Sequence, residues 1–398
     1  MNRISISDLY LFPRRKVLSI VLLILVILKL LYVFAFFTRI LVWPVNDYQI
    51  GEILLNYHSG LQKRSLIGTI ILWLSENRIR IMLLIKLIFL LSVFCLFISL
   101  FAPLKKLPVR FALLVAIIFI CSPFGMSFYC DSWLKKEILF FPILLAATSL
   151  MKMNNTVIRF LLLNLLVVAG CLIHEAFICL GLPFIICICF LNGQKINDIL
   201  SLLVVAFCST ALVYFYSVKP EPAMTNYVIS LNHLGFDTTG YLTHPVSYLR
   251  MNTPEMIRFS FHRFKLSYFL MYCILYFLNA FFVFRIIKMH FIDPENIFCR
   301  KLLLSLLVVH ISVIPLFFLG MDYGRWFSFV FIISLLLISN QLWTENPEML
   351  TPLPGKKVIF EWASFCLFFL LINIPPLPSF NVYNPINYAT AFLTFFQR

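Results

Sequence analysis

Charged residues are scarce in this chain: Asp, Glu, Lys and Arg make up 12% of its 398 residues, while hydrophobic residues make up 62%. Apolar runs of span length leave no room for a separate soluble domain. The alternation of apolar and polar residues that marks an outer-membrane barrel is also absent. These absences leave the helical membrane proteins as the class to which the chain belongs.

Disulfide and metal-binding patterns are also missing. The eleven cysteines form no CxxC pair and no Cys/His metal spacing, and most lie inside apolar runs, where a free cysteine behaves as a small hydrophobic residue. His174-Glu175 lacks the second histidine of the HExxH motif, which excludes a zinc protease. We therefore expect neither a metal nor a cofactor.

The chain does carry an excess of positive charge, with a formal net charge of +15. No basic and aromatic module of a nucleic-acid-binding protein accompanies it, so nucleic acid is excluded as a partner. Positively charged cytoplasmic loops in contact with anionic lipid explain the excess instead. Membrane lipid is the partner that this charge predicts.

Long apolar runs are the main feature that is present. The pattern predicts an all-α polytopic membrane protein, one integral membrane domain over residues 1–398, with about 11 transmembrane helices. Residues 65–74 are apolar but too short to cross, and are predicted to form a re-entrant or interfacial helix. The predicted spans are roughly 17–38, 81–102, 111–129, 138–151, two within 160–191 separated at His174, 199–217, 265–286, 302–320, 327–343 and 358–374.

Basic residues near the start of the chain set the expected orientation. Arg3, Arg14, Arg15 and Lys16 precede the first span and predict a cytoplasmic N-terminus. The first run has no small-residue cleavage site after it, so it is predicted to remain as an uncleaved span. The longest hydrophilic segment, 218–264, then falls on the outer side, where its hydrophobic content favours an ordered cap.

Polar residues interrupt the apolar pattern at several points on the predicted outer side. Lys and Arg are disfavoured on that side, and binding a phosphate or pyrophosphate is one reason to keep them there. We predict that these residues converge on an anion-binding cleft; the alternative is that they form turn salt bridges and lipid-headgroup contacts. The positions are Asp47, Lys63, Arg64, Asp131, Lys136, His174, Glu175, Asp322 and Arg325.

Three of these positions have residue types suited to proton transfer. Asp47 follows the first span and fits a general base, or a hydrogen-bond acceptor for a sugar hydroxyl, or a helix N-cap. His174 beside Glu175 breaks a hydrophobic run, and such a pair accepts a proton near neutral pH or forms a buried structural pair. Elsewhere, Lys29 lies near the middle of the first span and must face protein or extend to the interface.

Short motifs on the outer side resemble those of a known group of enzymes. The segment G-L-Q-K-R-S-L-I-G (60–68), the turn D-Y-G-R-W (322–326), Asp47 and the large loop 218–264 together resemble the O-antigen and exopolysaccharide polymerases (Wzy and EpsG-like proteins). These fall within the broader GT-C-type membrane glycosyltransferases. The resemblance implies transfer of glycan repeat units from an undecaprenyl-pyrophosphate donor at the outer face of the bacterial inner membrane, with a chain-length regulator as a further partner.

The resemblance also implies roles for the predicted site residues. Glu175 or His174, with Asp47 as second choice, would deprotonate the acceptor hydroxyl, and Arg64, Arg325 and Lys136 would stabilise the departing pyrophosphate. A transferase that adds one sugar from a polyprenyl-phosphate donor is an alternative. A flippase or transporter is another, but charge in the middle of the predicted spans is almost limited to Lys29.

Overall fold

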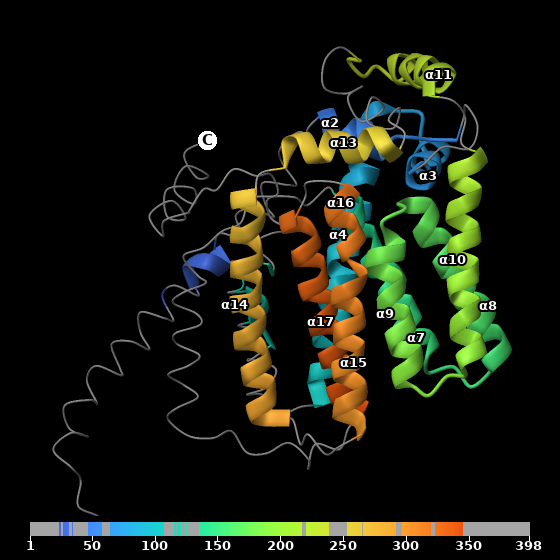
Figure 1. Cartoon of the computed structure of the whole chain (residues 1–398). Helices are drawn as coiled ribbons and strands as arrows, with labels where there is room; N and C mark the ends of the chain where they lie inside the picture. The colour runs from blue at the N-terminus through green and yellow to red at the C-terminus, as the bar shows by residue number, and fades with distance from the viewer. Residues whose placement is uncertain are drawn as a thin grey trace, which may run out of the picture.

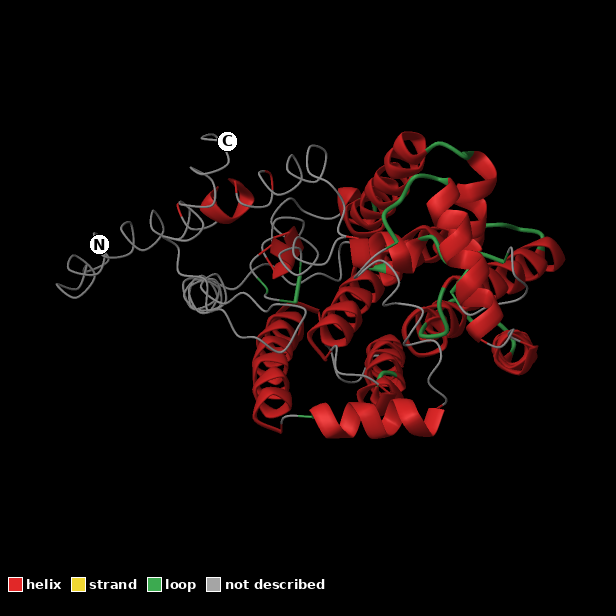
Figure 2. Cartoon of the chain, turned by 90° about the horizontal axis from the view of Figure 1, so that it is seen from above, coloured by secondary structure: helices red, strands yellow, loops and turns green. Residues whose placement is uncertain are grey.

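The computed structural model describes residues 24, 27–31, 34, 47–57, 64–106, 115–116, 118–120, 122, 124–125, 135–216, 220–238, 253–264, 266–291, 297–319 and 323–344. Every regular element in these ranges is a helix, and Figure 2 shows no strand among them. Within the described residues the protein is therefore all-α, as the apolar pattern predicted.

Five helices in the described ranges are long and apolar enough to cross a membrane. They cover Arg78–Phe101, Thr156–Ile173, Ile196–Tyr216, Arg300–Leu319 and Tyr323–Asn340. Two further apolar helices, Phe177–Leu191 and Phe269–Phe281, are shorter. This confirms a helical membrane protein. The predicted spans at 17–38 and 111–129 lie partly, and that at 358–374 wholly, outside the described residues.

The long helices run side by side as a bundle, and short helices lie across one end of it (Figure 1). The bundle contains α4 (Arg78–Phe101), α7 (Phe140–Leu150), α8 (Thr156–Ile173), α9 (Phe177–Leu191), α10 (Ile196–Tyr216), α14 (Leu266–Phe291), α15 (Ile297–Ser312) and α17 (Tyr323–Thr344). The end covered by α2 (Asp47–Ile53), α3 (Leu66–Leu74), α11 (Pro220–His233) and α13 (Thr253–Arg263) is called the capped end, and the opposite end the far end.

Three further short helices belong to the described part of the fold. They are η1 (Pro103–Lys106), η2 (Lys136–Leu139), which leads directly into α7, and α16 (Ile314–Leu319), which follows α15. α7 has 11 residues, about 16 Å of helix, so it is too short to cross a bilayer by itself. The loop predicted at 218–264 contains α11 and α13, and both lie across the capped end.

The helix α17 forms the core of the bundle. It packs against α4, α9, α14 and α15, and its residues Phe329, Ile332 and Leu336 are buried. Outer helices instead expose large apolar side chains such as Leu165 and Phe207. Such faces suit contact with lipid tails, since a bilayer places no penalty on exposed apolar surface.

The sequence specifies the helix boundaries through caps and a proline. The side chain of Asn77 accepts hydrogen bonds from the backbone N–H groups of Ile79 and Arg80, which begins α4. Pro183 inside α9 has no N–H to donate to the carbonyl of Cys179. That carbonyl oxygen accepts a hydrogen bond from Ser312 Oγ at 2.8 Å instead, which links α9 to α15.

Lys29 confirms one expectation about the first predicted span. Its side chain is almost completely buried, with 1% of its surface exposed, so it faces protein rather than lipid. The run 160–191 is also divided at His174, as predicted, because α8 ends at Ile173 and α9 begins at Phe177. The short connection between these helices places two polar residues at the capped end.

Candidate functional site

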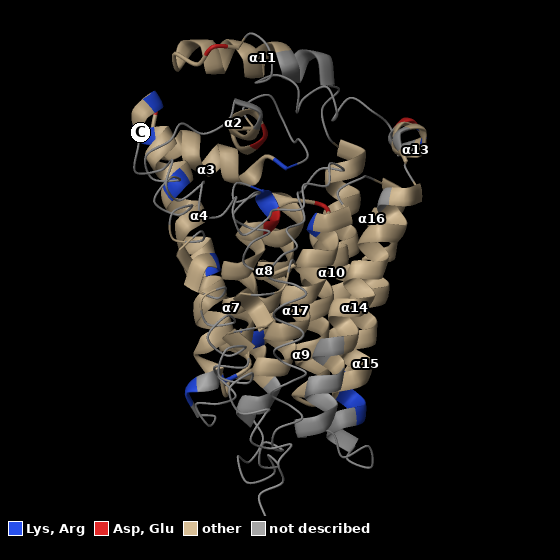
Figure 3. Cartoon of the chain, turned by 90° about the vertical axis from the view of Figure 1, so that its left-hand side faces the viewer, with Lys and Arg blue, Asp and Glu red and all other residues tan. Residues whose placement is uncertain are grey.

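Seven polar and charged side chains meet at the capped end, and we call them the ion-pair cluster. They come from α2, the residues just before α3, η2, the α8–α9 turn and the first turn of α17. Figure 3 shows the acidic and basic residues of this region beneath α2 and α3. The members are Glu52, Arg64, Lys136, Glu137, His174, Glu175 and Arg325.

Arg64 bridges two carboxylates of the cluster. Its Nε donates to both carboxylate oxygens of Glu175, at 2.9 and 3.1 Å, and its Nη2 donates to Oε1 at 2.5 Å. Its Nη1 lies 3.8 Å from Oε1 of Glu52. Burial would raise the pKa of Glu175, but Arg64 and then His174 hold it well below its usual range. Glu175 is therefore ionised at neutral pH.

Arg325 and His174 flank a second carboxylate, that of Glu137. Arg325 Nη1 lies 3.1 Å from Oε1 of Glu137 and donates to Oε2 at 3.3 Å. Burial would raise the pKa of Glu137, but Arg325 and His174 lower it below its usual value. Removing one partner of a buried pair of this kind costs about 3–5 kcal/mol, because the other charge stays buried.

His174 is held in one tautomer. The backbone N–H of Ala176 donates to Nδ1 at 3.0 Å, so the proton of the neutral ring is on Nε2, which lies 3.9 Å from Oε1 of Glu137. Burial and Arg64 lower the pKa of His174 to about 4, although Glu175 and Glu137 oppose this. The imidazole is therefore neutral at pH 7. The lone pair on its Nδ1 atom already accepts the hydrogen bond from Ala176 N–H.

Lys136 contacts the backbone at Arg64 and is fully buried. Its Nζ donates a short hydrogen bond to the backbone carbonyl oxygen of Arg64. Burial lowers the pKa of Lys136 to about 7; Glu52 opposes this and Arg64 adds to it. Among the described residues Arg64 is the only non-glycine residue with positive φ, at 61°. This left-handed conformation costs roughly 1–2 kcal/mol, and the contacts to Lys136 and Glu175 hold it in place.

Close packing of α3 on the end of α2 brings Glu52 to Arg64. A Cβ atom on Gly68 would lie 2.0 Å from the carbonyl oxygen of Leu55, so only glycine permits this approach. Tyr227 of α11 also donates from its hydroxyl to the carbonyl oxygen of Gly51, at 2.6 Å. Burial would raise the pKa of Glu52, but the surrounding cations, Lys135 first, lower it to about 2.

An aromatic layer below the cluster supports the α8–α9 turn. The ring of Phe177 packs against the backbone at Gly170 and Gly181, where a Cβ atom would lie 2.6 and 2.2 Å from ring carbons. Phe140 meets the same ring edge-on, with the ring centroids 5.0 Å apart. This packing fixes the first turn of α9 and with it the positions of His174 and Glu175.

Exposure distinguishes the members of the cluster. The side chain of Glu175 is 38% exposed and that of Arg64 is 26% exposed, whereas Glu137 and Glu52 are 3% and 7% exposed. An incoming ligand would therefore meet Glu175 and Arg64 first. The remaining members hold these two groups in place and balance their charge.

The structure brings together five of the nine predicted site residues. These are Arg64, Lys136, His174, Glu175 and Arg325. Asp47 is the first residue of α2, but its side chain is not among those described. Lys63, Asp131 and Asp322 lie outside the described residues. Arg325 lies in the first turn of α17 and pairs with Glu137, 188 positions away along the chain.

Glu52 and Glu137 belong to the cluster but are not among the nine predicted site residues. Both had a signal, since Glu52 lies in the polar stretch before α3 and Glu137 follows Lys136 directly. Within the described part of the chain, no group of three His, Cys, Asp or Glu residues is placed to hold a metal ion.

Comparisons of the chain with protein-family models, with curated proteins and with solved structures found no match. The geometry of the ion-pair cluster is therefore the basis on which a function is proposed.

Proposed function

We propose that this protein is a bacterial envelope-polysaccharide polymerase of the O-antigen type, with about 11 spans, that takes glycan repeat units from undecaprenyl-pyrophosphate donors. The observation that carries the proposal is the convergence of Arg64, Arg325 and Lys136 in one cluster at one end of an apolar bundle, with a partly exposed carboxylate, Glu175, bound to Arg64. Arginine forks match phosphate oxygens, and a carboxylate beside them can accept the proton of an attacking hydroxyl.

The clamp between Arg64 and Glu175 suggests how substrate starts the reaction. Phosphate oxygens of the donor compete with Glu175 for the guanidinium of Arg64. The side chain of Arg64 is more exposed than that of Arg325, the other arginine of the cluster. Once Arg64 turns toward the pyrophosphate, the pKa of Glu175 rises because its main counter-charge has moved. Glu175 then becomes a stronger base than it is in the resting cluster.

The chemical step transfers the glycan to an acceptor hydroxyl. Glu175 takes the hydroxyl proton, the acceptor oxygen bonds to the anomeric carbon of the donor glycan, and the bond from that carbon to the pyrophosphate oxygen breaks. The bonding electrons leave with the pyrophosphate, and Arg64 and Arg325 stabilise the added negative charge. Glu175 suits the role of base better than His174, whose lone pair is used by Ala176 N–H.

The positive charge at the far end supports an orientation in which the ion-pair cluster at the capped end faces outward. Described Lys and Arg residues collect there with Asp198 as the only described carboxylate among them, whereas basic and acidic residues are mixed at the capped end. Lys and Arg favour the cytoplasmic side, so we propose that the far end and the N-terminus are cytoplasmic. The far-end residues are Lys105, Lys152, Arg159, Lys195, Arg300 and Lys301.

Glycan length tests the proposed function. Arg64→Ala and Arg325→Lys should each abolish the long-chain ladder of the envelope polysaccharide at normal protein level, in a strain whose own copy is deleted. Lysine at position 325 keeps a positive charge beside Glu137 but lacks the arginine fork that matches phosphate oxygens. Arg258→Ala is the matched control, since Arg258 is an exposed arginine on α13 at the same end. Wild-type ladders in both cluster variants would remove these arginines from the mechanism.

The residual glycan separates the polymerase from the alternative enzymes. If the ladder is lost but lipopolysaccharide core with one repeat unit remains, the protein is a polymerase. If one specific sugar is lost instead, it is a transferase that uses a polyprenyl-phosphate donor. Purified protein in detergent that elongates lipid-linked repeat units would exclude a flippase.

A further inference from the structure

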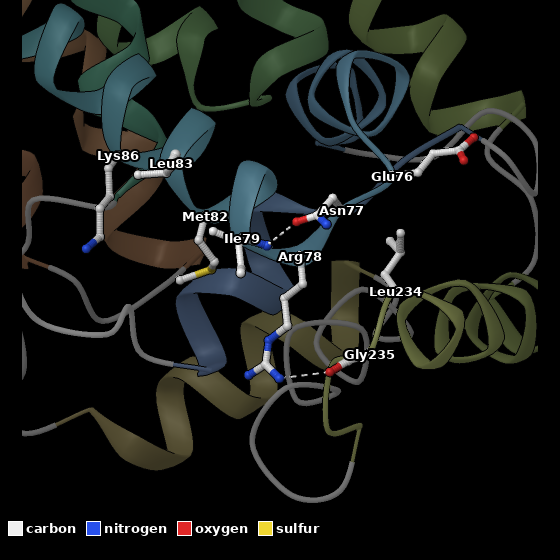
Figure 4. A pocket seen from close by; sticks show the side chains of 9 residues that line it. All are labelled: Glu76, Asn77, Arg78, Ile79, Met82, Leu83, Lys86, Leu234 and Gly235. Carbon is white, nitrogen blue, oxygen red and sulfur yellow. Dashed lines mark hydrogen bonds between the residues drawn. The ribbon is translucent and has the colours of Figure 1, made fainter.

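A groove of about 740 Å³ lies beside α4 at the capped end, apart from the ion-pair cluster. Figure 4 shows its lining, which comes from the first turns of α4, the residues just before it, and the chain that follows α11. No member of the ion-pair cluster lines it. The lining residues are Glu76, Asn77, Arg78, Ile79, Met82, Leu83, Lys86, Leu234 and Gly235.

The apolar wall of the groove belongs to the exposed face of α4. Ile79 and Leu83 are 70% and 61% exposed, and the same face continues through Leu87, Leu91 and Phe94. These residues recur at intervals of three and four, which places them on one side of the helix. In a membrane that side contacts lipid tails, so the groove is continuous with a lipid-facing surface.

The polar wall holds two cations at different depths. Lys86 is eight residues beyond Arg78 along α4, about 12 Å, which is within the roughly 15 Å half-thickness of a bilayer core. A lysine at that depth extends its ammonium group toward the interface. In Figure 4 the side chains of Arg78 and Lys86 extend from α4 toward the same side.

The end of α11 closes the groove from above. Gly235 has φ 78°, and the bonds from Gly235 N to Asn232 O and from Phe236 N to Leu231 O end the helix in a Schellman motif. Arg78 Nη1 donates to the Gly235 carbonyl at 2.9 Å, and its guanidinium lies 5.2 Å from the centre of the Phe236 ring. Arg78 thus connects α4 to the end of α11 at the rim of the groove.

We propose that this groove binds an anionic phospholipid of the membrane, with the phosphodiester near Arg78 and Lys86 and the acyl chains along α4. Arg78 and Lys86 against Glu76 give the lining one net positive charge, which matches the single negative charge of a phosphodiester. A pyrophosphate carries more negative charge than this lining balances. The bound lipid would hold the end of α11, at Leu234 and Gly235, against α4.

Photocrosslinking tests the site on the full-length protein. The protein is reconstituted in nanodiscs of phosphatidylcholine with a trace of phosphatidylglycerol that carries a diazirine in its acyl chain. Crosslinks should concentrate on residues 79–86 and be displaced by unlabelled phosphatidylglycerol, while extra phosphatidylcholine has no effect. Arg78→Gln and Lys86→Gln should each reduce the crosslinking affinity about fivefold, the effect of one basic residue at a membrane surface.

Arg80→Gln is the matched control. Arg80 is exposed in the same turn of α4 but does not line the groove, so its loss should leave the crosslinks unchanged. Glutamine at position 78 keeps a donor for the Gly235 carbonyl, and thermal unfolding of each variant checks that it is folded. Equal crosslinking by a phosphatidylcholine probe, equal effects of all three variants, or displacement by undecaprenyl pyrophosphate alone would each overturn the proposal.

Discussion

Each buried charge in the ion-pair cluster depends on a neighbour for its protonation state. Burial alone would raise the pKa of Glu137 and of Glu175, yet Arg325 and Arg64 hold both pKa values below the ordinary value and keep both groups ionised. His174 is the opposite case, because burial and the Arg64 charge keep it neutral. The cluster therefore has a defined charge pattern only while these side chains stay in contact.

The neutral state of His174 predicts sensitivity to acid. Its pKa is about 4 in the folded protein against an ordinary value of 6.5, so between these values the unfolded chain binds more protons. Stability should therefore fall as the pH is lowered from 6.5 to 4, even though Glu137, Glu175 and Glu52 partly offset the charge on the ring. Thermal unfolding in detergent across this range measures the effect.

His174→Asn should flatten that pH dependence, since an asparagine oxygen can accept the Ala176 N–H without titrating. His262→Asn, on the exposed surface of α13, is the control and should keep the wild-type slope. A wild-type slope in His174→Asn would show that another group causes the acid sensitivity.

Close backbone packing positions the elements that carry the cluster. α3 lies directly on residues 53–55 because Gly68 has no side chain, and the Tyr57 N–H donates to Thr69 Oγ1 at 2.8 Å across the same contact. This geometry determines where the chain at Arg64 turns toward Glu52. The positions of the charged side chains in the cluster therefore depend on helix packing.

Gly68→Ala should disturb this packing severely. The added Cβ would meet backbone atoms of Leu54 and Leu55, which cannot rotate away as a side chain can. We expect a loss of stability clearly above the roughly 1–2 kcal/mol of left-handed backbone strain expected for Gly193→Ala. Gly193 is a suitable control because it has φ 68° with open space around it. Thermal unfolding of both variants in detergent gives the comparison, and an equal or smaller loss in Gly68→Ala would contradict the packing argument.

The molecule as a whole is asymmetric along the bundle axis. Short helices, an ion-pair cluster and a lipid-facing groove lie at the capped end, whereas the far end has short turns rich in Lys and Arg. Such a difference in charge sets the orientation of the protein in the membrane, because basic residues are retained on the cytoplasmic side. The proposed chemistry requires the capped end to face outward.

Cysteine labelling tests this orientation with two matched asparagines. Asn226, exposed on α11, lies at the capped end, and Asn154, exposed before α8, lies at the far end. A membrane-impermeant maleimide should label Asn226→Cys in intact spheroplasts and Asn154→Cys only after permeabilisation. The unsubstituted protein gives the background from its native cysteines. The reverse labelling pattern would place the cluster in the cytoplasm and exclude the proposed donor.

Much of the fold could be predicted from local pattern. The break at His174, the short helix before α4 and the extents of α8, α9 and α10 follow from apolar run lengths and polar interruptions. Which charged side chains pair with one another could not be predicted in this way. Arg64 contacts Glu175, 111 positions away, and Arg325 contacts Glu137, 188 positions away. The polar stretch around Glu52 was visible in the sequence, but its pairing with Arg64 depends on the packing of α3.

The sequence by itself determined that the protein is a helical membrane protein and which residues are too polar to face lipid. That is a local property, because a bilayer requires each spanning segment to be apolar over its own length. Only the tertiary structure decided which carboxylate neutralises which cation, and that the pair of Glu175 and Arg64 is more exposed than the pair of Glu137 and Arg325. Coulomb attraction acts between groups a few ångströms apart in space, and their separation along the chain does not fix that distance.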